Sequence, residues 1–158
     1  MNIQEVTGNI LQCPHNEDTI IIPVNCIGVM GKGLALQTKL QYPEVYEFYK
    51  ELCDEDYITT LGHVYAANRK YLLEMQEISN PQVVILFPTK DHWKNPSQLT
   101  YIENGLQGLV NWLSIQPDKR KVGIPKLGCG LGGLDWKDVY PLITQYLSPL
   151  PHEFTLYV

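Results

Sequence analysis

VGIPKLGCGLGGLDW, residues 122–136, is the stretch that decides the fold. It begins with an apolar run, residues 122–125, which is typical of the end of a buried strand. Four glycines follow within six residues: Gly128, Gly130, Gly132 and Gly133. Asp135 then suits the N-cap of a helix. A strand, a glycine loop and a helix N-terminus together form an anion site, most often for phosphate, although the same glycines also suit a tight turn that only packs a helix on a strand.

A second glycine loop follows an earlier apolar run. Residues 20–24, IIIPV, predict a strand that is covered on both faces. The loop after it, residues 25–35 (NCIGVMGKGLA), again has several glycines and leads into a helical pattern. Because open α/β sheets bind ligands at the carboxyl ends of their strands, the two loops suggest two backbone cradles for phosphates. Neither loop matches the nucleotide motif GxxxxGK[ST].

The composition is that of one globular domain. The chain has 158 residues, 44% of them hydrophobic and 18% charged, which predicts a single domain over residues 1–158. A net charge of −5 leaves no broad basic face, so a nucleic acid would have to be held locally. The four cysteines show no metal-ligand spacing, and we expect reduced thiols in a cytoplasmic monomer without a metal. No apolar run approaches bilayer length, so no membrane contact is expected.

Strands and amphipathic helices alternate along the rest of the chain. The most apolar strand is expected at residues 83–87, and residues 62–78 are expected to form two strands joined by a turn at 68–70. Asn95 and Pro96 suit the N-cap and first position of a helix, whereas Pro141 is tolerable only in a first turn. The alternation predicts a three-layer α/β fold with a mixed, mostly parallel central sheet.

Lys90 is the most informative single residue. It follows the most apolar strand, next to Thr89, where ligand sites of parallel sheets form. A half-buried lysine at this point would lose hydration and become a candidate nucleophile or Schiff-base former. The alternative is a solvated loop lysine, because most lysines are exposed.

Three polar or aromatic residues near the predicted strand ends have two interpretations each. Trp93 could stack on a ring of the ligand or cap the following helix, and His92 could act as an acid–base partner or lie on the surface. Asn25 could bind sugar hydroxyls or satisfy the backbone of its own turn.

Four motifs, in matching order and almost end to end, resemble those of a macrodomain. They are TGNIL at 7–11, the loop at 25–35, FPTK at 87–90 and GCGLGGLDW at 128–136. The resemblance is greatest to the macrodomains of DarG antitoxins, which remove ADP-ribose from DNA bases, and to the related terminal ADP-ribose glycohydrolase branch. It implies a three-layer α/β/α macrodomain that binds ADP-ribose and uses no cofactor.

The resemblance also implies a set of site residues. Asn9 and Ile10 would lie near the adenine, Asn25 would touch the distal ribose, and Lys90 matches the family's catalytic lysine, with Thr89 beside it. Two segments would wrap the diphosphate and distal ribose, namely Gly31, Lys32, Gly33 and Leu34, and Gly128, Cys129, Gly130, Leu131, Gly132 and Gly133.

The chain departs from the terminal glycohydrolase branch at Gly132. That branch has an aspartate at the matching position, which handles protons while the lysine attacks the anomeric carbon. Here the carboxylate is missing, as in the DarG-like branch. Lys90 would therefore act alone, either as a nucleophile or as an electrostatic and proton-transfer group, and the sequence leaves both roles open.

These motifs predict an ADP-ribosyl glycohydrolase that cleaves an N-glycosidic bond, with ADP-ribosylated DNA as the expected substrate. The alternatives are a reader that binds ADP-ribose without turnover and a phosphatase acting on ADP-ribose 1″-phosphate. DarG antitoxins usually carry a further C-terminal domain, so the chain is expected to be a stand-alone macrodomain or an isolated catalytic domain.

Overall fold

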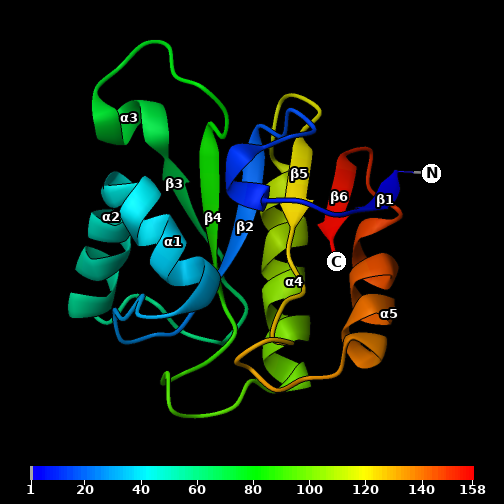
Figure 1. Cartoon of the computed structure of the whole chain (residues 1–158). Helices are drawn as coiled ribbons and strands as arrows, with labels where there is room; N and C mark the ends of the chain where they lie inside the picture. The colour runs from blue at the N-terminus through cyan, green and yellow to red at the C-terminus, as the bar shows by residue number, and fades with distance from the viewer. Residues whose placement is uncertain (1) are drawn as a thin grey trace.

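The computed structural model describes residues 2–158 as a six-stranded sheet packed between helices (Figure 1). The strand order is β1-β6-β5-β2-β4-β3. The strands are β1 (Ile3–Val6), β2 (Thr19–Val24), β3 (Tyr65–Asn68), β4 (Val83–Pro88), β5 (Lys121–Ile124) and β6 (Glu153–Tyr157). The helices are η1 (Ile10–Gln12), α1 (Gly33–Gln41), α2 (Pro43–Asp54), α3 (Arg69–Leu73), α4 (Leu99–Ser114) and α5 (Trp136–Leu147).

The sheet is mixed and mostly parallel, as predicted. The five strands β1, β6, β5, β2 and β4 run parallel to one another. Only β3 runs antiparallel, at the edge, where Tyr65 pairs with Leu86. Strands β5, β2 and β4 are therefore adjacent, and their carboxyl ends point the same way.

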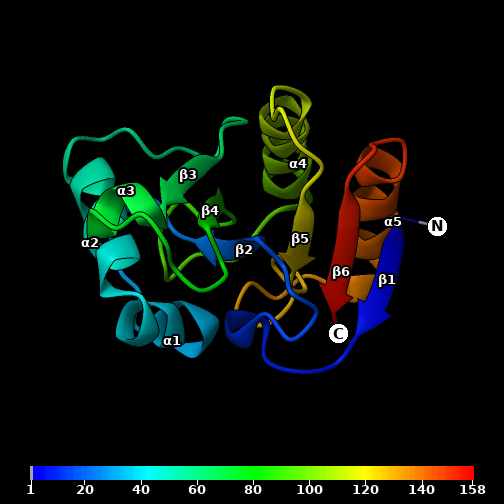
Figure 2. The same ribbon diagram turned by 90° about the horizontal axis from the view of Figure 1, so that it is seen from above.

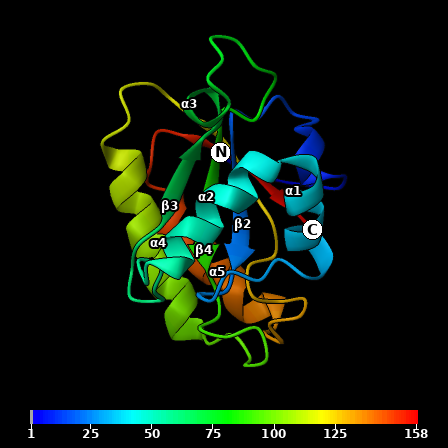
Figure 3. The same cartoon turned by 90° about the vertical axis from the view of Figure 1, so that its left-hand side faces the viewer.

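Helices cover both faces of the sheet, which confirms the three-layer arrangement. Seen from the β3 edge, α4 lies on one side of the strands and α1 lies on the other (Figure 3), and the view from above places α5 on the side of α4 (Figure 2). The side chains of β2 alternate between the two cores: Ile20 and Ile22 pack with α2, whereas Ile21 packs with α4 and α5. The apolar run at residues 20–24 is therefore buried on both faces of the sheet, as predicted.

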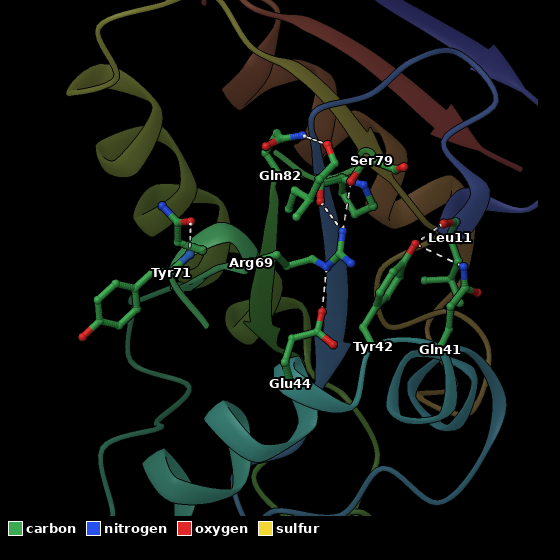
Figure 4. Close-up of polar contacts among 11 residues, drawn as sticks. Leu11, Gln41, Tyr42, Glu44, Arg69, Tyr71, Ser79 and Gln82 are labelled. Carbon is green, nitrogen blue, oxygen red and sulfur yellow. Dashed lines mark hydrogen bonds and ion pairs between the residues drawn. The ribbon is translucent and has the colours of Figure 1, made fainter. Parts of the chain in front are cut away.

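A charged cluster holds α2, α3 and the loop before β4 together (Figure 4). Arg69 Nε lies 2.7 Å from Glu44 Oε2, and both side chains are only 11% exposed. The guanidinium also donates to the carbonyl oxygens of Ser79 and Pro81 and lies 4.3 Å from the Tyr42 ring centroid. Because the guanidinium pairs with a carboxylate and two carbonyl oxygens, its buried charge is compensated.

A buried carboxylate fixes the chain between η1 and β2. Glu17, only 1% exposed, accepts hydrogen bonds from the His15 N–H at 2.8 Å, from Thr155 Oγ1 at 3.1 Å and from the Tyr157 hydroxyl. Gly123 of β5 makes room for it, since a Cβ there would lie 3.0 Å from Glu17 Oε2 and 3.3 Å from Ile10.

The prediction of two strands in residues 62–78 is wrong for the second strand. Only β3 forms, and Asn68 caps a short helix by accepting from the Tyr71 N–H at 3.3 Å. Asparagine serves as a turn residue and as an N-cap equally well, so the sequence signal was ambiguous.

Two helix details also differ from expectation. Helix α4 begins at Leu99 after Gln98, because the Asn95 side chain bonds Asp91 and the Ser97 N–H bonds the Gly132 carbonyl. Pro141 is the sixth residue of α5, beyond the first turn. Thr144 Oγ1 donates to the Pro141 carbonyl at 3.0 Å, in the turn that follows the proline.

Within residues 2–158, none of the helices has the length and apolar character needed to cross a bilayer.

Candidate functional site

Three loops meet at the carboxyl edge of the sheet, after β2, β4 and β5. The first two are joined directly: the Cys26 N–H donates to the Asp91 carbonyl at 3.1 Å, and Cys26 Sγ donates to the Lys90 carbonyl at 3.3 Å. The third is joined to the second, because the Ser97 N–H donates to the Gly132 carbonyl at 3.0 Å. The sequence motifs that lie far apart in the chain thus share one edge.

Lys90 lies at the junction of the last two loops. Its Nζ donates to the Leu131 carbonyl at 3.0 Å and to the Trp93 carbonyl at 3.3 Å. The residue is half-buried, and its amine is bonded to the second glycine loop in an exposed position. This is the position that a lysine needs in order to act on a ligand held by that loop.

The first glycine loop is shaped by Asn25. Its Oδ1 accepts from the N–H groups of Ile27 at 3.1 Å and Val29 at 3.3 Å, and its Nδ2 donates to the Val29 carbonyl at 2.7 Å. The side chain is buried. The structure therefore shows Asn25 as a residue that satisfies the backbone of its own turn. Its contact with a distal ribose stays a prediction.

At the end of the first glycine loop the residues are exposed where α1 begins. Gly31, Lys32 and Gly33 are exposed, and Leu34 is half-buried against the core. Gly33 has φ +56°, in the left-handed region that favours glycine. Lys32 is the N-cap of α1 and makes no side-chain capping bond, so the first N–H groups of α1 lack a side-chain acceptor from that residue.

The second glycine loop folds back on itself around Gly132. The Leu134 N–H donates to the Gly128 carbonyl at 2.9 Å, and Gly128 has φ +73°. A Cβ at position 132 would lie 2.3 Å from the Gly128 carbonyl oxygen and 2.4 Å from Ser97 Oγ. Position 132 therefore has no room for the aspartate of the terminal glycohydrolase branch.

The outer side of this loop borders an open pocket of about 580 Å³. Its lining comes from the loop and the start of α5: Lys126, Cys129, Gly130, Gly133, Leu134, Asp135 and Trp136. Asp135 caps α5 as predicted, accepting from the Lys137 N–H at 3.0 Å.

The predicted adenine residues lie on η1. Asn9 is exposed and caps this short helix by accepting from the Leu11 N–H at 3.0 Å, whereas the Ile10 side chain is buried in the core. Among the hydrogen bonds described for residues 2–158, none joins Asn9 to either glycine loop. Thr89 is also buried, and its N–H donates to the Val24 carbonyl at 2.9 Å.

The thiols near the site are held protonated. Burial, and secondarily the neighbouring Cys53, raises the pKa of Cys26 to about 12. Burial also raises the pKa of Cys129 in the second loop. Neither thiol is a thiolate near neutral pH, so neither is a candidate nucleophile.

Two supporting residues were missed in the sequence. Tyr49 of α2 is not among the predicted site residues, yet its hydroxyl bonds the first glycine loop. Ser97 lies against Gly132, and its buried Oγ has no hydrogen-bond partner among residues 2–158. A tyrosine within an apolar helical stripe was the one available signal, because such a hydroxyl needs a partner when buried.

Comparison with known proteins identifies the family. A family model described as Macro domain matches residues 21–143. The chain belongs to the macrodomain family. This macrodomain is 35% identical over 145 residues to a DNA ADP-ribosyl glycohydrolase of Mycobacterium tuberculosis, covering 92% of the chain and 38% of the relative. The predicted resemblance is confirmed.

Solved structures agree with this assignment. The macrodomain of Mycobacterium tuberculosis DarG superposes with a TM-score of 0.88 at 35% identity, covering 98% of this macrodomain and 96% of that chain. Thermosipho africanus DarTG, whose structure is a complex with ADP-ribose, superposes with a TM-score of 0.85 at 37% identity. The match covers 99% of this macrodomain and 41% of that chain. The macrodomain thus spans well under half the length of the full-length relatives that it matches.

Proposed function

We propose that this macrodomain binds ADP-ribose and hydrolyses the bond that joins it to a DNA base. One observation carries the proposal: the Lys90 amine lies 3.0 Å from the Leu131 carbonyl, at the junction of two loops on the ligand-binding edge of the sheet. The names of its relatives support the substrate class, since they are DNA ADP-ribosyl glycohydrolases.

In this proposal the two glycine loops bind the diphosphate. The N–H groups at the start of α1, after Gly33, carry the positive end of the helix dipole and favour a phosphate. Asn9 would contact the adenine with its exposed side chain, whereas Ile10 would contribute its backbone, because its side chain lies in the core. Asn25 would reach the distal ribose through the Nδ2 hydrogen that Val29 does not use.

The reaction breaks the bond between the anomeric carbon and the base nitrogen. The oxygen of a water molecule bonds to the anomeric carbon, and the base leaves with a proton. Lys90 has two possible roles: attack on the anomeric carbon, giving a covalent adduct that water resolves, or charge stabilisation and proton transfer without a covalent step. Borohydride trapping separates them, because it reduces an imine formed at Lys90 to a stable adduct that mass spectrometry detects.

The decisive experiment compares wild type with Lys90→Ala on an ADP-ribosylated single-stranded oligonucleotide and on an ADP-ribosylated protein. We expect wild type to release ADP-ribose from the oligonucleotide and the variant to be slower by about 100-fold or more. The affinity for free ADP-ribose, measured by calorimetry, should change little. Lys70→Ala is the matched control, because Lys70 is exposed on α3 at the other edge of the sheet.

The other outcomes decide against the proposal. Binding of ADP-ribose with no release by wild type would show a reader. Release of phosphate from ADP-ribose 1″-phosphate, without release from DNA, would show a phosphatase. Equal rates for wild type and Lys90→Ala would remove Lys90 from the mechanism while leaving the hydrolase in place.

A further inference from the structure

The turn that follows Lys90 presents an open indole. Trp93 is 47% exposed, and it lies at the carboxyl edge of the sheet together with the two glycine loops. Across the Lys90 amine, Leu131 is 67% exposed. A large aromatic face left uncovered beside a candidate site is typical of a surface that contacts a ligand.

This indole projects from an ordered turn. Asp91 Oδ1 accepts from the His92 N–H at 2.7 Å and from Asn95 Nδ2 at 3.1 Å. The Lys94 N–H donates to His92 Nδ1 at 3.1 Å. A ligand that contacts the ring therefore need not first order the chain that carries it, which lowers the entropy cost of binding.

The surroundings of the ring are aromatic and cationic. The His92 and Trp93 ring centroids lie 5.5 Å apart with a 30° interplanar angle, and Lys94 Nζ lies 5.2 Å from the Trp93 centroid. Among the ion pairs of residues 2–158, none involves Lys90 or Lys94. Neither amine therefore has a carboxylate partner that would compete with a phosphate.

The charge of this edge is opposite to that of the whole chain. The loops at 25–33, 89–98 and 125–135 contain four lysines and two aspartates, a formal excess of two positive charges, against a net charge of −5 overall. The four lysines are Lys32, Lys90, Lys94 and Lys126. A polyanion would thus be attracted to this edge and repelled elsewhere.

The ring and the candidate catalytic amine are fixed to each other. The Trp93 carbonyl accepts from Lys90 Nζ at 3.3 Å, so one short turn carries both groups. A group attached to a sugar that reaches the amine would therefore lie near the turn that carries the indole and Lys94.

We propose that Trp93, with His92 and Lys94, forms a stacking platform for a nucleotide of single-stranded DNA that flanks the modified base. The inference rests on the proposed function and names its substrate form. A base would stack on the indole, and the Lys94 ammonium would turn from the ring to the adjoining phosphate. Duplex DNA does not fit, because both faces of each of its bases are covered by neighbouring bases.

The test has two measurements. The first is binding of an unmodified, fluorescein-labelled oligothymidylate, followed by anisotropy. We expect Trp93→Ala to weaken it by about fivefold or more, Trp93→Phe to retain most of it, and pairing with oligoadenylate to abolish it. Tyr71→Ala is the matched control, since Tyr71 is an aromatic residue 81% exposed on α3, at the opposite edge.

The second measurement is release of ADP-ribose from a modified single strand. Trp93→Ala should raise the KM for the oligonucleotide and leave the affinity for free ADP-ribose unchanged. The platform would be contradicted if Trp93→Ala bound oligothymidylate as tightly as wild type. It would also be contradicted if the substitution weakened the affinities for free ADP-ribose and for DNA equally. If wild type binds oligothymidylate through Trp93 but releases nothing, the proposed hydrolase fails and the platform stands. If wild type releases ADP-ribose and Trp93→Ala matches it, the platform fails and the hydrolase stands.

Discussion

The hydroxyl of Tyr49 lies 2.6 Å from Oδ1 of Asn25. It also accepts from the Gly28 N–H at 3.2 Å, and its burial raises the pKa of Tyr49, which keeps the hydroxyl protonated. A fully buried side chain of α2 thus fixes both the asparagine and a glycine of the first loop. The shape of this loop therefore depends on a buried hydroxyl of α2.

Replacing Tyr49 with phenylalanine should loosen the loop. The Gly28 N–H would lose its partner in a buried position, so we expect the free energy of unfolding to fall by about 1–3 kcal/mol. ADP-ribose affinity, measured by calorimetry, should fall in parallel. Tyr46→Phe is the control, because no hydrogen bond to the Tyr46 hydroxyl is present among residues 2–158. Equal effects of the two substitutions would contradict this role.

Gly132 and Gly130 should respond very differently to alanine. A Cβ at 132 meets the Gly128 carbonyl at 2.3 Å and Ser97 Oγ at 2.4 Å, whereas a Cβ at 130 meets nothing within 4 Å. Gly132→Ala must open the loop, and we expect a loss of about 1–3 kcal/mol in the free energy of unfolding. Gly130→Ala should stay within about 0.5 kcal/mol of wild type. Urea denaturation of both variants measures the contrast, and similar midpoints would mean that the loop is not closed in this way.

Removing Arg69 should cost far more than removing a surface lysine. Arg69→Ala leaves the Glu44 carboxylate, 11% exposed, without its partner. We expect a loss of about 3–5 kcal/mol in thermal or urea unfolding. Lys50→Ala breaks the Lys50–Asp54 pair, whose side chains are 47% and 62% exposed, and should cost about 0.5 kcal/mol or less. A double variant, Arg69→Met with Glu44→Leu, should recover much of the loss if the uncompensated charge is its cause.

Alkaline pH should destabilise the fold through its buried thiols. Burial raises the pKa of Cys13 from 9.0 to about 12, with the Glu17 carboxylate adding to the effect. Between pH 9 and 12 the unfolded chain releases this proton and the native chain retains it, so stability falls as pH rises. Cys13→Ala should show a shallower decline in unfolding midpoint over that range. A decline as steep as that of wild type would assign the effect to other groups.

The sheet and the loop positions followed from residue patterns alone. The apolar runs at 20–24 and 83–87 predicted buried strands, and these form the paired strands β2 and β4 of the central sheet. Helix α2 begins at Pro43, and proline is favourable at the first position of a helix. Such elements are predictable because burial on two faces and a fixed proline φ are local properties of the sequence.

What could not be predicted depends on contacts between distant segments. Asn95 and Pro96 have the chemistry of a helix start, yet the Ser97 N–H is taken by the carbonyl of Gly132, thirty-five positions along the chain, and α4 begins later. The partners of the Lys90 amine are likewise backbone carbonyls, which no side-chain pattern encodes. The role of Tyr49 could not be predicted for the same reason, because its hydroxyl bonds a distant loop although the residue lies on the apolar face of its helix.

The absence of a side chain at Gly123 has an effect beyond its own strand. The gap it leaves in β5 admits the Glu17 carboxylate and the Ile10 side chain, and these two residues anchor the segment that carries Asn9. Filling that gap, even with a methyl group, would push on the anchor and shift Asn9, the residue proposed to contact the adenine. A mutation in mid-sheet could in this way tune ligand selectivity without touching the reacting groups.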